Sequence, residues 1–150
     1  MIEAQNTKKV LLLPPQLKDD GDFANNTYVD TMGWGYSEFL FIMGATDVAV
    51  GSTAEATKPL IEQCDTSGGD YVAITGAELG AVIADSKDSK IKQIDVNLQE
   101  GTYKRFMRVQ APHAANGTTG ANMAIVCILS KPLKMPESAA ERGLDEQVIV

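Results

Sequence analysis

Histidine, cysteine and aromatic residues are scarce in this chain of 150 residues. It contains one histidine, His113, and two widely separated cysteines, Cys64 and Cys127. The cysteines have no ligand-like neighbours, which excludes Cys-x-x-Cys zinc and redox sites. We expect both to be buried, reduced thiols. His113 lies in a loop rich in proline, alanine, asparagine and glycine, and we expect it to be exposed to solvent rather than to act as a base.

Motifs for cofactor, metal and nucleophile chemistry are also missing. Gly33–Trp34–Gly35 lacks the third glycine and the following helix of a dinucleotide fingerprint. Asp19–Asp20–Gly21–Asp22 does not have the alternating ligands and closing glutamate of a calcium loop. No serine lies in a Gly-x-Ser-x-Gly pattern. We therefore expect no catalytic residue, no metal ligand and no cofactor, and we expect that the protein is not an enzyme.

Positive charge is in short supply. The net charge is −7, whereas phosphate binding needs clustered lysine and arginine, so we expect no nucleic-acid partner. No apolar run approaches the roughly 20 residues that span a membrane. The start, Met1–Asn6, is polar and unlike a secretory signal. We expect no membrane partner, and we expect folding in a cytoplasm.

What the chain does contain is a set of strand patterns. Tyr36–Met43 is apolar on both alternating faces and is flanked by glycines, which is typical of a strand in the middle of a layered β structure. Ala121–Leu129 is a second run of this kind and its expected neighbour. Lys8–Leu13 predicts a first strand that Pro14–Pro15 should end.

Shorter patterns complete the predicted set of strands. Further strands are expected at Thr27–Met32, Lys58–Cys64, Tyr71–Thr75, Gln93–Leu98 and Tyr103–Val109, the second and third of them as a hairpin, and Asp47–Val50 is a short apolar segment. Gly76–Ala84 fits a helical turn or two, and Ala111–Ala121 reads as a long loop. The sequence therefore predicts an all-β, single β-sandwich or jelly-roll-like domain over 1–136. An acidic C-terminal extension, as a tail or arm with a short helix near Ala139–Arg142, covers 137–150.

Three groups of residues are candidates for contact with a partner. Lys104, Arg105 and Arg108 form a local basic cluster, either an exposed strand face that discourages edge pairing or a patch for an acidic partner surface. The chain ends on Val148, Ile149 and Val150, either as a solubilising segment or as an arm laid on a neighbouring subunit. Lys8 and Lys9 of the N-terminal segment complete the candidates.

Several strand sequences carry a family resemblance. Lys8–Gln16, Tyr28–Gly33 and Gly44–Asp47, with Ile94–Val96 and Tyr103–Phe106, resemble small proteins encoded among the head genes of tailed bacteriophages. The resemblance covers most of residues 8 to 130 and departs from the family after Pro136. It implies a capsid decoration (cement) protein: a β-sandwich, often a homotrimer, that binds the outer face of the major capsid protein shell. Such a protein is made in the bacterial host cytoplasm and resides on the virion surface.

Two alternatives remain open from the residues. One is a carbohydrate-binding β-sandwich for host adhesion, for which Trp34, Tyr71 and Tyr103 are the exposed-aromatic candidates. The other is a minor head–tail or tail structural protein of a phage. Copy number in the virion separates the second alternative from a decoration protein.

Overall fold

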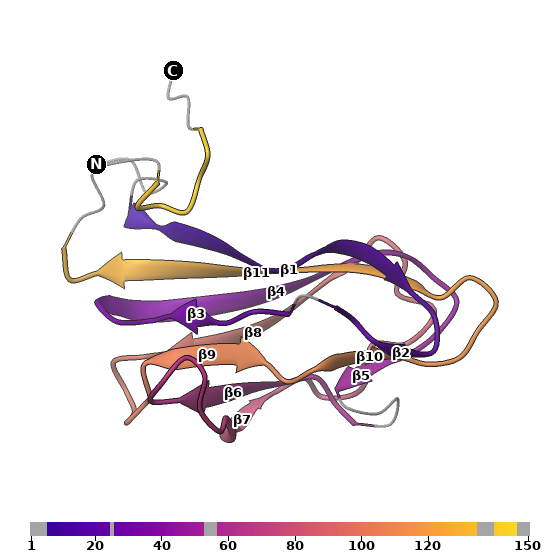
Figure 1. Ribbon diagram of the computed structural model, residues 1–150, viewed down its shortest axis with the longest axis horizontal. Helices are drawn as coiled ribbons and strands as arrows, with labels where there is room; N and C mark the ends of the chain where they lie inside the picture. The colour runs from indigo at the N-terminus through magenta and orange to yellow at the C-terminus, as the bar shows by residue number, and fades with distance from the viewer. Residues whose placement is uncertain (1–5, 25, 53–56, 135–139, 147–150) are drawn as a thin grey trace.

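The fold is all-β, as the sequence predicts. The computed structural model describes residues 6–24, 26–52, 57–134 and 140–146, and no helix occurs among them. The largest sheet, sheet A, is antiparallel and contains the longest strands (Figure 1). Its strand order is β1 (Lys8–Lys18), β11 (Ala121–Pro132), β4 (Trp34–Thr46) and β8 (Ile91–Asn97).

Two further antiparallel sheets complete the sandwich. Sheet C has the order β3 (Val29–Asp30), β9 (Phe106–Val109), β6 (Leu60–Cys64) and β7 (Val72–Glu78). Sheet B has the order β2 (Gly21–Asp22), β10 (Pro112–Ala114) and β5 (Val50–Ser52). Sheets A and C pack face to face, because the buried side chains of both belong to one core cluster, among them Phe39, Phe41, Ile125, Ile61, Met107 and Val109.

The two predicted central strands lie side by side. β4 and β11 are the inner strands of sheet A and pair over most of their length, with Phe39 opposite Cys127 and Phe41 opposite Ile125. One alternating set of β4 side chains points into the core. The other set, which includes Leu40 and Ile42, points outward and is half-buried or exposed. The apolar residues on both faces thus mark a strand in a two-layer sandwich, with one of its apolar faces uncovered.

The expectation that Pro14–Pro15 ends the first strand is wrong. β1 continues through both prolines to Lys18, and its pairing with β11 shifts register between Leu13 and Gln16. A proline costs a sheet little at an edge strand or a bulge, and β1 is the edge strand of sheet A.

Other boundaries also differ from the sequence predictions. The strand expected at Thr27–Met32 contains only the two residues of β3. The expected helical turns at Gly76–Ala84 are instead the end of β7 followed by bends. The expected long loop Ala111–Ala121 contains β10, so His113 is half-buried on a strand, with Nδ1 2.9 Å from Oδ1 of Asp22. The described tail residues 140–146 form turns rather than a helix.

The predicted hairpin is confirmed, with β6 and β7 antiparallel neighbours. β6 begins at Leu60, so Pro59 lies just outside the strand. The strand expected at Gln93–Leu98 is also present, as β8, with Ile94 and Val96 buried. Both cysteines are buried free thiols.

Candidate functional site: the terminal end of the sandwich

One end of the sandwich collects segments that are distant in the sequence. β1 begins and β11 ends there, and the loops between β3 and β4 and between β8 and β9 lie at the same end. Figure 1 shows the start of β1 and the end of β11 side by side at this end. We call it the terminal end and define it as residues 6–9, 31–34, 65–71, 98–106, 131–134 and 140–146.

An ion pair across the β3–β9 ladder fixes Arg105. Its Nε and Nη2 donate to the two carboxylate oxygens of Asp30 at 3.0 and 2.7 Å, and its guanidinium lies 4.9 Å from the ring centre of Phe106. The hydrogen bond from Arg105 holds the pKa of Asp30 below its usual range, and the charges of Arg105 and Lys8 act in the same direction. The fold thus brings Arg105 and Asp30, 75 residues apart in sequence, into one ion pair.

Arg108 and Lys104 are also paired with carboxylates. Arg108 donates from Nε to Glu62 at 2.9 Å and lies 4.1 Å from the ring centre of Tyr71. Glu62 is buried, and its other oxygen accepts a bond from the Gln110 side chain at 2.9 Å. Lys104 lies 3.0 Å from Asp65. Each cation of the predicted basic cluster therefore has an internal partner, which fixes its position and reduces the net charge of the surface.

Apolar side chains at this end project into solvent. Met32 is 69% exposed and Leu133 is 84% exposed, and the amide of Leu133 donates to the carbonyl of Gly33 at 2.8 Å. This bond ties the two short segments together. Exposed apolar side chains beside fixed arginines and aromatic rings are the composition of a protein–protein interface.

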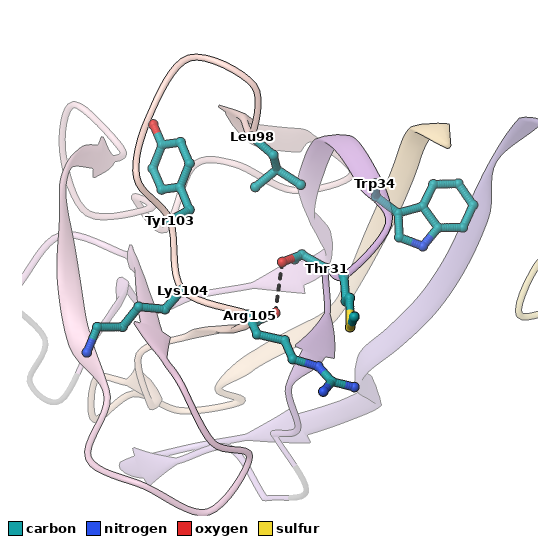
Figure 2. A pocket seen from close by; sticks show the side chains of 7 residues that line it. Thr31, Trp34, Leu98, Tyr103, Lys104 and Arg105 are labelled. Atoms are coloured by element: carbon teal, nitrogen blue, oxygen red, sulfur yellow. Dashed lines mark hydrogen bonds between the residues drawn. The ribbon is translucent and has the colours of Figure 1, made fainter. Parts of the chain in front are cut away.

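A recess of about 330 Å³ opens between the β3–β4 and β8–β9 loops (Figure 2). Leu98 and Thr31 point toward it, and the Thr31 hydroxyl donates to the carbonyl of Arg105 at 2.8 Å. The rings of Trp34 and Tyr103 lie on opposite sides and point away from each other (Figure 2). They do not form a common stacking platform for a sugar, and Tyr71 stacks instead on Arg108.

The described part of the C-terminal tail reaches the same end. The amide of Lys9 donates to the carbonyl of Arg142 at 2.7 Å, on the open edge of β1. Gly143 follows with a φ of +72°, and a Cβ there would lie 1.8 Å from the carbonyl oxygen of Lys9. The tail therefore covers part of the edge of sheet A.

The structure gathers five of the eight contact candidates at or beside this end. Lys8, Lys9, Lys104 and Arg105 lie in it, and Arg108 lies two residues further along β9. Val148, Ile149 and Val150 lie outside the described residues. Sequence reasoning missed Met32 and Leu133. An isolated apolar residue in a turn was the available signal, but only the strand register shows that the two turns adjoin.

No protein-family model matches the chain, and no curated protein matches it. Over the described ranges, no cluster of three or more histidine, cysteine, aspartate or glutamate side chains has the geometry to hold a metal ion. None of the described segments is a helix with the length and apolar character needed to cross a membrane.

Proposed function

We propose that this protein is a bacteriophage capsid decoration protein that binds the outer surface of the major capsid protein shell through its terminal end. The observation that carries the proposal is the gathering there of fixed cations and exposed apolar side chains from segments distant in sequence. The sequence resemblance over residues 8 to 130 supports the choice of partner. The role is structural and non-catalytic, and it needs no cofactor.

The mechanism is linkage by mass action. A protein that binds the assembled shell and not its free subunits stabilises the shell by an amount that grows with the ratio of free ligand to dissociation constant. Many copies on one particle multiply the effect. Preorganisation lowers the cost of binding, because Asp30 and Glu62 already hold Arg105 and Arg108 in place.

The first test is the composition of the particle. Purified virions should contain this chain in a copy number comparable with that of the major capsid protein, measured by quantitative mass spectrometry. A count of only a few copies per particle would reject decoration in favour of a head–tail or tail role. Absence from the particle would reject a virion role altogether.

The second test locates the contact. Leu133→Asp and Lys104→Glu should each weaken binding of the purified protein to empty shells by about tenfold. The first change places a charge in the expected contact, and the second reverses one. Lys87→Glu is the matched control, because it makes the same charge change at the opposite end of the sandwich, and it should bind as the wild type does. Unchanged binding by both terminal-end variants would place the shell contact elsewhere.

A further inference from the structure

The outer face of sheet A carries a partly exposed apolar surface. Seven side chains from all four strands form it, and we call it the apolar face: Leu11, Leu40, Ile42, Ile91, Ala124, Val126 and Ile128. Leu11 and Ile91, at opposite edges of the sheet, are 51% and 61% exposed. Contiguous apolar patches of more than a few hundred Å² are rare on monomers and mark interaction sites.

The apolar face crosses all four strands of sheet A, which lie about 4.8 Å apart and make it roughly 19 Å wide. Along the strands it extends over three cross-strand rows, from the row of Ile128 to that of Ala124, a length of about 14 Å. It is the apolar centre of a contact, and the polar rows on either side of it would form the rim.

The charges beside the apolar face are complementary to one another. One cross-strand row runs Lys9, Ile128, Glu38, Asp95 from β1 to β8. It places a cation at one edge of the face and carboxylates at the other side. Consider a second copy related to the first by a two-fold axis that runs parallel to the strands and passes between β11 and β4. The strands of the second copy then face those of the first in the reverse order, and each cross-strand row faces the same row of the other copy. Lys9 of each copy then meets Asp95 of the other.

The same operation matches the apolar rows. Leu40 of one copy lies over Val126 of the other, and Ile42 lies over Ala124. Sheets that pack face to face lie about 10 Å apart with strands within about 30° of parallel, so these rows interdigitate near the axis. The apolar centre of the face is thus complementary to itself, which is the requirement for a two-fold interface, while Glu38 of each copy lies over Ile128 of the other in the neighbouring row.

We infer that the apolar face binds a second copy of this chain, and that the free protein is a two-fold dimer joined through the outer faces of sheet A. The inference stands independently of the proposed function. It also bears on that function, because an axis parallel to the strands points the terminal ends of both copies in the same direction. Both are then presented to one surface, and two linked contacts bind far more tightly than one.

The mass of the purified full-length protein tests the inference directly. Light scattering on a sizing column should give about 32 kDa, twice the 16.1 kDa of the chain. Ile91→Asp should shift the protein to a monomer. Val72→Asp is the matched control, because Val72 is an exposed apolar strand residue of sheet C, and it should remain a dimer.

Charge exchange tests the two-fold geometry. Lys9→Glu and Asp95→Lys should each raise the dimer dissociation constant by about tenfold, since each places like charges together. The double variant, Lys9→Glu with Asp95→Lys, should return it to within about twofold of the wild type. Lys9 is half-buried and Asp95 is exposed, and circular dichroism confirms that each variant is folded.

Other outcomes overturn the inference. A monomer at all concentrations, or the trimer that the family resemblance implies, would reject the dimer. A dimer that survives Ile91→Asp would place its interface elsewhere, and failure of the double variant to recover would reject the proposed axis. A monomer whose shell binding is lost in Ile91→Asp would assign the apolar face to the shell. None of these results depends on the copy number in virions, so the two proposals fail separately.

Discussion

At the scale of single residues, the clearest structural device is Asp47, at the end of the sandwich opposite the termini. Its carboxylate accepts backbone hydrogen bonds from Thr118, Thr119 and Gly120 at 3.1, 2.9 and 2.7 Å. These bonds, that of Thr119 most of all, hold the pKa of Asp47 below its usual range despite the opposing effect of desolvation. The charged form of Asp47 therefore stabilises the loop between β10 and β11.

This arrangement predicts a pH-dependent effect of Asp47→Asn. The asparagine side chain has one oxygen that accepts hydrogen bonds and an NH₂ group that only donates them. The variant should therefore be less stable than the wild type at pH 7. Because the pKa of Asp47 is lower in the folded protein, its charge stabilises the fold at pH values above about 3.9, the ordinary pKa of aspartate. This stabilisation is lost as the pH falls through the folded-state pKa. The gap in unfolding free energy between variant and wild type, measured with urea, should therefore close in acid.

The matched control is Asp70→Asn, which removes the same charge from an exposed turn. Its effect on stability should be small, and it should not follow the pH dependence of Asp47→Asn. A gap for Asp47→Asn that stays constant from neutral pH into strong acid would contradict the role of the charged carboxylate.

At the scale of elements, sheet A has two edge strands, and the chain treats them differently. β1 carries two prolines and a register shift, and it is met by the tail through the bond between Lys9 and Arg142. Each of these features discourages pairing with another chain at the edge. The sequence shows the prolines, but it does not show that their strand lies at an edge, which is why the expected strand end at Pro14 was wrong.

The contact between the tail and β1 predicts a local effect of Gly143→Ala. The positive φ and the 1.8 Å approach to the carbonyl of Lys9 leave no room for a methyl group, so the tail should detach from the strand edge. Hydrogen exchange of the Lys9 amide should then accelerate by at least about tenfold, because local opening no longer requires breaking the bond to Arg142. The unfolding free energy should change little.

Gly33→Ala is the control for backbone strain. Gly33 has a φ of +86°, but no atom lies within 4 Å of the point where an added methyl group would sit, so alanine there costs only about 1 kcal/mol of strain. It should leave exchange at Lys9 unchanged. Unchanged protection of Lys9 in Gly143→Ala would show that the tail does not protect the edge.

At the scale of the whole molecule, the sequence predicts the central strands of the sheets better than it predicts the ends of the sandwich, which are built from loops. Tyr36–Met43 and Ala121–Leu129 are recognised because both faces are apolar, and they pair as predicted. The terminal end is not predictable in this way. Its assembly depends on which strands are neighbours, and the ion pair between Asp30 and Arg105 follows from the register of β3 against β9.

The two cysteines report on whether this molecule opens as one unit. Cys127 is fully buried in the central strand β11, and burial raises the pKa of its thiol well above the usual range. Only its thiolate reacts, so labelling of Cys127 by a thiol reagent should require global unfolding. Cys64 is the last residue of β6, at the terminal end, where opening of the sandwich end alone exposes it.

We therefore predict that Cys64 labels at least about tenfold faster than Cys127 under native conditions, because sub-global opening costs less than global unfolding. Cys127→Ser and Cys64→Ser isolate the two rates, and mass spectrometry follows each over a urea series. The opening free energy of Cys127 should equal the global unfolding free energy, while that of Cys64 should be smaller and less dependent on urea. Equal rates at both sites would mean that the terminal end does not open separately, and that the surface proposed to bind the shell is as rigid as the core.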